Sequence, residues 1–313
     1  MTYATGHSIP QSSPPRPPRE TLPTMYDLPS EWPEEPGLPD VGASPSRDEF
    51  HDLQPQLLSR TLALADYSRD QWFAASDLNL YYNVHKPLWH KRPDWFLAVG
   101  VSRLYEQRDL RLSYVTWQEG QAPHVIVEFL SPGTETEDLG RFYGSGDGSA
   151  ADAYPPPAPP EERQPPGKFA VYEQHLRVPH YITYDRRTQR LRYFQLLAGQ
   201  YQEQPLAPKP PQIWLTDLQV GLGIWFGSFE GVSSHWLRWC DGEGQWLWTD
   251  TERAEQAQAQ ERRAKEQEQR AKESAQAQVL QTARALMAQG MTLQDVIALM
   301  QLTPEQVQQL QHP

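Results

Sequence analysis

The sequence predicts an α/β protein whose core is a mixed sheet flanked by helices, with a Pro-rich arm before it and a helical extension after it. Three observations lead to this prediction. Short apolar runs with the alternation of strands fill the middle of the chain, together with two helical patterns. Prolines cluster in two stretches outside those runs. From Thr251 to Ala288 the composition changes to Glu, Gln, Ala, Arg and Lys, which all favour helix.

Two stretches of the chain have the composition of non-globular segments. Eleven of the 30 prolines lie in residues 1–50 and seven in residues 133–167. The first stretch has eight acidic and three basic residues and the second has seven and two, so each carries a net charge of −5. Such segments bury too little apolar surface to fold alone. We therefore expect a disordered arm over residues 1–48, and a disordered insertion at 133–167 within a domain of residues 49–249.

Apolar spacing predicts the elements of that domain in order. Glu49–Ala65 has mostly helical spacing, so we expect an amphipathic helix that tolerates Pro55 near its start. A second helix is expected at Lys168–Val178, where Pro179 ends it. Residues 200–249 should add further strands, with a hairpin turn at Gly242-Glu243-Gly244. The expected strands of the sheet lie near Leu78–Val84, Trp95–Val99, Leu112–Trp117, Val125–Leu130, Tyr181–Tyr184 and Leu191–Leu197.

The C-terminal region is expected to be helical. Thr249 and Glu252 have the spacing of a capping box and Gly290 suits a helix end, so one long charged helix is predicted over residues 250–289. Its first half has almost only Ala as apolar residue, which favours an exposed helix or a loose coiled coil over a tight one. Residues 290–313 resemble a small helix-turn-helix-like tail. Of the side chains that read bases it offers only glutamines, so we expect protein docking or a homodimer through the C-terminal helices.

Composition and charge limit the class of protein. The single cysteine, Cys240, excludes an internal disulfide and a Cys-rich zinc site, and it fits a reducing compartment. With no apolar run of membrane-spanning length and no signal pattern, a soluble cytoplasmic protein without a membrane partner is expected. The net charge of −12 argues against a general nucleic-acid binder. Residues 51–132 and 168–249, however, have sixteen acids and sixteen bases, so this neutral core leaves room for a local basic groove.

Two carboxylates stand at the ends of apolar runs. Asp94 opens the run Trp95–Val99, and Glu128 lies near the end of the run Val125–Leu130. Carboxylates at the mouths of two adjacent strands suit a hard divalent cation such as Mg²⁺, which can activate water for phosphodiester cleavage. Asp94 could instead cap a turn at the start of its strand. For Glu128 the alternative is a structural salt bridge to Arg103 or Arg111, because an unpaired buried carboxylate would be costly.

The motifs around these carboxylates follow a recognisable order. They are Val127-Glu128-Phe-Leu-Ser131-Pro132, then Asp138, then Lys168-x-x-x-Tyr172, then Val178-Pro179-His180-Tyr181 and Asp185. Residues 50 to 229 thereby resemble the Uma-two family of bacterial endonucleases, a branch of the PD-(D/E)xK nuclease superfamily. The resemblance implies a restriction-endonuclease-like core with the element order α-β-β-β-α-β, and the elements predicted above contain this order with one further strand before the second helix and one after the last strand. The superfamily places a lysine two residues past the Glu, where this chain has Leu130, and this branch places it on the following helix, where the chain has Lys168.

The resemblance also implies an activity, which is hydrolysis of phosphodiester bonds in nucleic acid, with DNA the favoured substrate and Mg²⁺ or Mn²⁺ as cofactor. Asp94, Glu128 and the backbone carbonyl of Phe129 would hold the metal. Lys168 would stabilise either the attacking hydroxide or the charge that develops on the phosphate. The family usually places Asp138 and Lys168 a few residues apart. Here the Pro/Gly-rich insertion separates them, so Lys168 must fold back to reach the site.

Three further residues are possible supporting residues of this site, and each has two interpretations. Glu49 could complete the metal shell, as an acidic residue does in many nucleases of the superfamily, or be a solvated acid in the first turn of a helix. Asp138 could orient Lys168 or cap the insertion. Tyr172 could support the catalytic residues or be a core aromatic with a satisfied hydroxyl. The histidines lack metal-ligand spacing and are expected to be ordinary polar or surface residues, namely His51, His85, His90, His124 and His175.

A second hypothesis belongs to a different class of protein. The nuclease fold could be a catalytically inactive scaffold that acts in protein–protein assembly through its C-terminal helix. The position of Lys168 separates the two hypotheses, because a lysine beyond hydrogen-bond reach of the carboxylates would weaken the enzymatic one.

Overall fold

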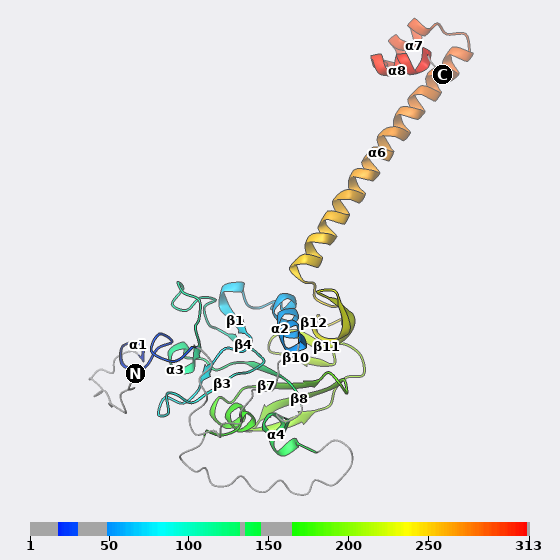
Figure 1. Ribbon diagram of the computed structural model, residues 1–313. Helices are drawn as coiled ribbons and strands as arrows, with labels where there is room; N and C mark the ends of the chain where they lie inside the picture. The colour runs from blue at the N-terminus through cyan, green and yellow to red at the C-terminus, as the bar shows by residue number, and fades with distance from the viewer. Residues whose placement is uncertain (1–17, 31–48, 132–134, 145–164, 312–313) are drawn as a thin grey trace. The chain divides into compact units, whose positions relative to one another are not determined.

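The computed structural model describes residues 18–30, 49–131, 135–144 and 165–311, and the chain divides into two compact units, residues 1–247 and 248–313 (Figure 1). The first unit contains the sheets and the second is entirely helical where it is described. Within the described ranges, every helix is too short or too polar to cross a lipid bilayer.

The centre of the first unit is a six-stranded mixed sheet. Its strands are, in spatial order, β1 (Trp72–Ala75), β4 (Trp95–Val99), β6 (Val125–Phe129), β7 (His180–Asp185), β8 (Arg190–Leu197) and β9 (Gln200–Gln204). Only β6 and β7 pair in parallel, and the other neighbours are antiparallel. A parallel pair needs a crossover connection. Here the crossover includes α4 (Glu135–Leu139) and α5 (Lys168–Ala170), which brings both helices to the central strands.

Alternating residues of the sheet belong to two separate apolar cores. On β6, Val125 and Val127 contribute to one core and Ile126 to the other, as the two-residue period of a strand requires. The first core contains the buried face of α2 (Glu49–Thr61) and most of the second sheet. The second core contains α5 and the π-helical turn η3 (Val171–His175) that follows it. Since β6 is covered on both faces, all five of its residues are buried.

A second, antiparallel sheet packs in the first core. It consists of β10 (Ile213–Leu215), β11 (Val220–Phe229) and β12 (Val232–Cys240). Buried Gln54 of α2 joins the helix to this sheet, because its amide donates to the Leu237 carbonyl at 2.8 Å and accepts from the Leu237 N–H at 2.7 Å. After β12 the chain turns between Asp241 and Gln245, which confirms the predicted hairpin turn. A smaller sheet is formed by β2 (Leu80–Tyr81), β3 (His90–Lys91) and β5 (Tyr114–Val115).

Several predicted elements are shorter than expected. Of Leu78–Val84 only β2 pairs, and Leu112–Trp117 forms β5 and then the short helix α3 (Thr116–Glu119). The expected helix at Lys168–Val178 is α5, which widens into η3. Strand β1 was not predicted, because four residues are too few for a periodic pattern.

The predicted disorder of 1–48 and 133–167 is wrong for the parts that the structure describes. Residues 18–30 contain α1 (Pro18–Thr21) and continue along the surface of the first unit, where Met25 and Leu28 are buried beside Tyr81. Residues 135–144 form α4 and the 3-10 turn η2 (Gly140–Phe142). In both places a few apolar side chains are buried against the rest of the first unit, which the amino-acid composition of the segment does not indicate. Residues 1–17, 31–48, 133–134 and 145–164 of these two stretches lie outside the described residues.

The C-terminal unit has the helices that its sequence predicts. Helix α6 (Asp250–Ala288) begins at a capping box in which the Thr249 hydroxyl accepts the Glu252 N–H at 3.1 Å. It ends where Gly290 takes a φ of +100°, a conformation that favours glycine. Then α7 (Leu293–Met300) and α8 (Pro304–Gln311) fold back, and a small core forms from Ala283, Val296 and Leu302. The homodimer through these helices stays a prediction.

Candidate functional site

The antiparallel pairing of β4 and β6 brings the two predicted carboxylates together. Trp95 pairs with Val127, so Asp94 and Glu128 are the next facing positions in that register. Both have the parity of Phe96 and Ile126, so both belong on the face that packs against the second core. The contact is direct, because the Asp94 N–H donates to Glu128 Oε2 at 3.3 Å.

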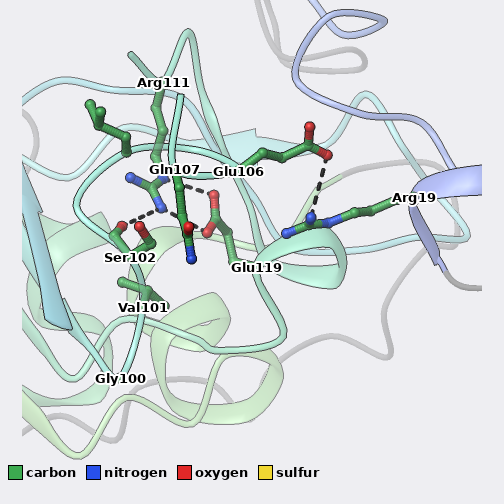
Figure 2. Close-up of a pocket in the computed structure, with 9 residues that line it drawn as sticks. Arg19, Gly100, Val101, Ser102, Glu106, Gln107, Arg111 and Glu119 are labelled. Carbon is green, nitrogen blue, oxygen red and sulfur yellow. Dashed lines mark hydrogen bonds and ion pairs between the residues drawn. The ribbon is translucent and has the colours of Figure 1, made fainter. Parts of the chain in front are cut away.

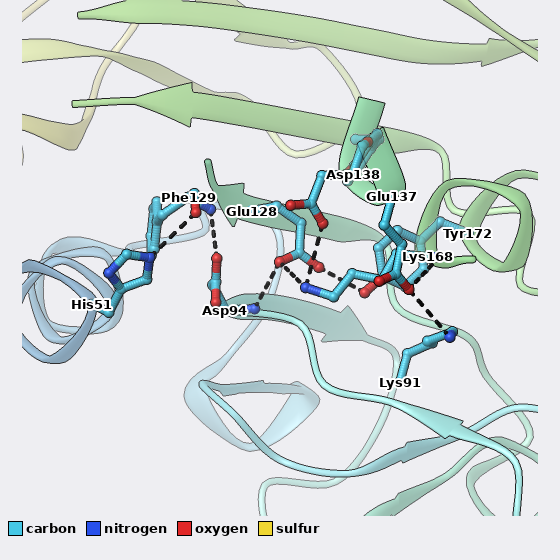
Figure 3. A network of polar contacts seen from close by, with 10 residues as sticks. His51, Lys91, Asp94, Glu128, Phe129, Glu137, Asp138, Lys168 and Tyr172 are labelled. Atoms are coloured by element: carbon cyan, nitrogen blue, oxygen red, sulfur yellow. Dashed lines mark hydrogen bonds and ion pairs between the residues drawn. The ribbon is translucent and has the colours of Figure 1, made fainter. Parts of the chain in front are cut away.

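Glu128 is completely buried and is held by two side chains from the crossover (Figure 3). The Lys168 ammonium donates to its Oε2 at 2.9 Å, and the Tyr172 hydroxyl donates to its Oε1 at 2.7 Å. Lys168 lies on α5 and Tyr172 one turn later in η3, so one short helical segment supplies both donors. The structure therefore places Lys168 within hydrogen-bond reach of the predicted site, despite the insertion before it.

The two ends of the crossover are fixed to each other near the site. Glu137 of α4 accepts the backbone N–H of Lys168 at 3.0 Å and pairs with the ammonium of Lys91 at 3.3 Å. Beside it, buried Asp138 lies 3.4 Å from the Lys168 ammonium. We call these contacts of Glu137 and Asp138 with Lys168 the crossover clamp. Of the two interpretations of Asp138, the geometry matches the one in which it orients Lys168.

The electrostatics of this cluster are dominated by burial. Burial raises the pKa of Glu128 to about 7; the positive charge of Lys168 opposes that shift and the negative charge of Asp94 adds to it. For Lys168, burial would lower the pKa, but Asp138 and Glu128 outweigh it and raise the pKa well above its ordinary value. The ammonium is therefore a permanent cation at neutral pH. Burial also raises the pKa of Tyr172, which stays a neutral hydrogen-bond donor.

The other side of Asp94 is turned toward the end of β6. Its Oδ2 accepts the Phe129 N–H at 2.6 Å, and the Phe129 carbonyl oxygen lies 3.3 Å from His51 Nε2 on α2 (Figure 3). The sequence predicts His51 to be an ordinary polar residue and gives no sign of this contact. Helix α2 thus reaches the site through His51, whereas Glu49 is exposed at the first helical position.

These atoms form a donor set of a definite kind. Two carboxylates and a backbone carbonyl all offer oxygen, which hard cations such as Mg²⁺ and Mn²⁺ prefer. The carboxylates of Asp94 and Glu128 face each other at the ends of adjacent strands. Glu128 is fully buried, so its negative charge is costly unless a cation lies beside it. The residues fit a divalent metal ion of this class.

Of the two alternative partners that the sequence suggested for Glu128, Arg111 is engaged elsewhere. Arg111 forms a bidentate ion pair with Glu119, at 2.8 and 2.9 Å, and donates to the carbonyls of Ser102 and Arg103. This buried pair lines a cavity of about 340 Å³ that also involves Arg19 from the N-terminal segment (Figure 2). The partner of Glu128 is Lys168.

A second cluster lies at the opposite end of the parallel strands. His124 precedes β6, His180 begins β7, and Asp217 lies between β10 and β11. Burial would raise the pKa of Asp217, but hydrogen bonds from both imidazoles outweigh it and hold the pKa well below its ordinary value. Sequence analysis expected His124 to be an ordinary polar residue. No spacing rule could find the cluster, because its members come from three distant segments.

Comparison with known proteins identifies a family. A family model described as "Putative restriction endonuclease" matches residues 40–226, which is more than half of the chain. The matched range includes the central sheet and the crossover, so the predicted restriction-endonuclease-like fold class is confirmed. None of the curated proteins matches the sequence.

Proposed function

Because the chain belongs to the Uma2 family of restriction endonucleases, we propose that it is a metal-dependent endonuclease that hydrolyses phosphodiester bonds in nucleic acid, with DNA as the favoured substrate. One observation carries the proposal. The Lys168 ammonium lies 2.9 Å from Oε2 of buried Glu128, although 39 residues separate them in the chain. This contact supports the proposal because the nuclease branch that the sequence resembles requires a lysine at the metal-binding carboxylates, and this chain supplies one across the insertion.

Asp94, Glu128 and the Phe129 carbonyl would hold Mg²⁺ or Mn²⁺. When bound, an ion of this class polarises a phosphoryl oxygen and lowers the pKa of a bound water. Its binding would also neutralise the two carboxylates, whose mutual repulsion is part of the cause of the raised pKa of Glu128. The oxygen donors and their burial support this assignment.

Lys168 would act through its charge. Since its pKa is raised, the ammonium keeps its proton and is unsuited to be a general base. A fixed cation beside the carboxylates can stabilise an attacking hydroxide or the negative charge that grows on the phosphate. Loss of one such preorganised group typically lowers kcat by about 10²–10³.

Three other side chains would position these groups. The Tyr172 hydroxyl fixes Glu128 by its hydrogen bond to Oε1, and Asp138 fixes the Lys168 ammonium from the other side. His51 lies against the Phe129 carbonyl and would orient it. Glu49, exposed at the start of α2, would be at most a distant contributor.

The test combines metal binding with cleavage. Mg²⁺ and Mn²⁺ are titrated by calorimetry into the wild type, Glu128→Gln and, as a matched control, Glu243→Gln, whose side chain is exposed in the turn after β12. The same proteins are then incubated with plasmid, single-stranded DNA and RNA. We expect Mg²⁺ binding and cleavage in the wild type and the control, and neither in Glu128→Gln. Equal cleavage by Glu128→Gln would refute the proposal, and absence of Mg²⁺ binding in the wild type would favour the inactive scaffold.

A further inference from the structure

Three side chains from separate elements converge at the end of β6 that lies away from Glu128. The parallel register pairs Val125 with His180, and the His180 N–H donates to the His124 carbonyl at 3.2 Å, so the two histidines are neighbours on adjacent strands. Their rings lie 5.3 Å apart. The turn between β10 and β11 then brings Asp217 of the second sheet against them.

The two imidazoles present the same kind of atom to the carboxylate. His124 Nε2 lies 2.5 Å from Asp217 Oδ2, and His180 Nε2 lies 3.0 Å from each oxygen of Asp217. One nitrogen from each ring and one carboxylate oxygen all lie within 4.8 Å of one another. In a tetrahedral zinc site, with bonds of about 2.0–2.1 Å, neighbouring ligand atoms are about 3.3 Å apart. Small side-chain movements would therefore close the three around one ion.

One of the histidines is already oriented as a ligand would be. His180 has a 4% exposed side chain, and its other nitrogen, Nδ1, lies 2.7 Å from the buried Tyr193 hydroxyl. Metal-bound histidines usually use their second nitrogen in this way, because the hydrogen bond fixes both the ring and its tautomer. In the metal-free protein the Nε2–H of His180 donates to Asp217. Metal binding would require the tautomer with hydrogen on Nδ1, which leaves the Nε2 lone pair directed at the cluster.

We propose that His124, His180 and Asp217 form a binding site for a divalent transition-metal ion of the zinc class. Two imidazole nitrogens and one carboxylate suit such an ion, whereas Mg²⁺ prefers oxygen ligands alone. The side chains of His124 and Asp217 are 24% and 46% exposed, so water can reach a fourth coordination position. Three protein ligands with one open position is the arrangement of reactive rather than purely structural zinc sites.

This site is separate from the proposed nuclease site. His124 and Glu128 lie at opposite ends of the same strand, and four residues at about 3.3 Å each place them about 13 Å apart. The ligands also come from two different sheets, because the histidines adjoin β6 and β7 of the central sheet and Asp217 follows β10 of the second sheet. A bound ion would therefore join the central sheet to the second sheet, and the inference does not depend on nuclease activity.

The experiment measures Zn²⁺ binding by the full, untagged chain. Zn²⁺ is titrated against a chromophoric chelator for the wild type, His124→Gln, Asp217→Asn and Glu128→Gln. Co²⁺ replaces Zn²⁺ in a parallel titration, because its visible absorption reports nitrogen ligands and coordination number. Circular dichroism in excess chelator verifies that each variant is folded. His124 and Asp217 are chosen because they are partly exposed, so their replacement disturbs the core less than replacement of His180.

We expect the wild type and Glu128→Gln each to bind one equivalent of Zn²⁺. In both His124→Gln and Asp217→Asn the affinity for Zn²⁺ should be lower by about tenfold to a hundredfold. The Co²⁺ spectrum should disappear in the same two variants. Zn²⁺ affinity that is unchanged in either of those variants overturns the proposal. So does a wild type that binds no Zn²⁺, which would leave the cluster as a hydrogen-bonded pair of histidines around an aspartate. Binding lost in Glu128→Gln alone would move the ion to the other end of β6 and also overturn it.

Discussion

The ion pair between Lys168 and Glu128 should show strong energetic coupling in the metal-free protein. The perturbation is a double-mutant cycle of Lys168→Met, Glu128→Gln and the two together. Lys168→Met removes the cation that lies 2.9 Å from a fully buried carboxylate. Glu128→Gln keeps the shape of that side chain and an acceptor for Tyr172, but it removes the charge.

The magnitude follows from burial. Loss of one partner from a buried ion pair costs about 3–5 kcal/mol, because the remaining charge stays out of water. The pKa of Glu128 is already raised to about 7, so near neutrality the carboxyl can take up a proton and reduce this cost. Removal of Lys168 also removes the positive charge that opposes the raised pKa of Glu128, so the carboxyl takes up a proton more readily in the variant and the loss falls at the lower end of that range. We therefore expect Lys168→Met to lose about 3 kcal/mol at pH 8, and the double variant to lose about 2 kcal/mol less than the sum of the single variants.

The assay is urea denaturation in excess chelator, followed by fluorescence of the eleven tryptophans. Free energies of unfolding are compared only among variants with equal dependence on urea, since a changed slope indicates a changed folded or unfolded state. Effects that add within about 0.5 kcal/mol would refute the reasoning, because they would mean that Lys168 does not compensate the charge of Glu128.

Three smaller predictions concern single contacts. Tyr172→Phe removes the donor to the buried carboxylate and should lower the free energy of unfolding by about 1–3 kcal/mol in the same assay. Gly140 has a φ of +49°, and a Cβ added there would lie 2.7 Å from the Phe169 ring. Gly140→Ala should therefore lower the free energy of unfolding by about 1–3 kcal/mol. Thr249→Ala removes the cap that holds the Glu252 N–H and should destabilise the first turn of α6 by about 1 kcal/mol, seen as faster hydrogen exchange there.

Each of these has a control in the same chain. Tyr143→Phe removes a hydroxyl from a side chain that is 47% exposed and should change stability little. Gly100→Ala has a similarly positive φ of +74° but no neighbour within 4 Å, so it isolates backbone strain from the clash. Thr249→Ser keeps the capping oxygen. A control that is as destabilised as its partner would contradict the corresponding prediction.

The parts of the fold that the sequence predicted well depend on local patterns. The run Val125–Phe129 and the cap at Thr249 each specify their element within a few residues, and both are observed. The pairing of Asp94 with Glu128 also follows from local patterns, because each carboxylate adjoins an apolar run that forms a central strand. The catalytic and metal-binding roles assigned to these residues stay predictions.

The parts that could not be predicted depend on contacts between distant segments. Met25 and Leu28 look like isolated apolar residues in a Pro-rich arm, and only the surface around Tyr81 gives them a place to bury. His51 was missed because its partner is a backbone carbonyl, which has no sequence signature. Asp217 also has no sequence motif around it, because its contact with the two histidines exists only once the second sheet has packed beside the central sheet.

The crossover clamp has a consequence for how the chain could be altered. Because Glu137 and Asp138 contact Lys168 directly, the place of Lys168 in the site is set by these contacts and not by the number of residues that connect α4 to α5. For flexible loops in general, a doubling of the length adds only about 0.6 kcal/mol of closure entropy. The number of residues between Asp138 and Lys168 therefore does not determine the distance between their side chains in the site. We therefore expect a fluorescent or affinity domain inserted between α4 and α5 to leave the Lys168 ammonium on Glu128.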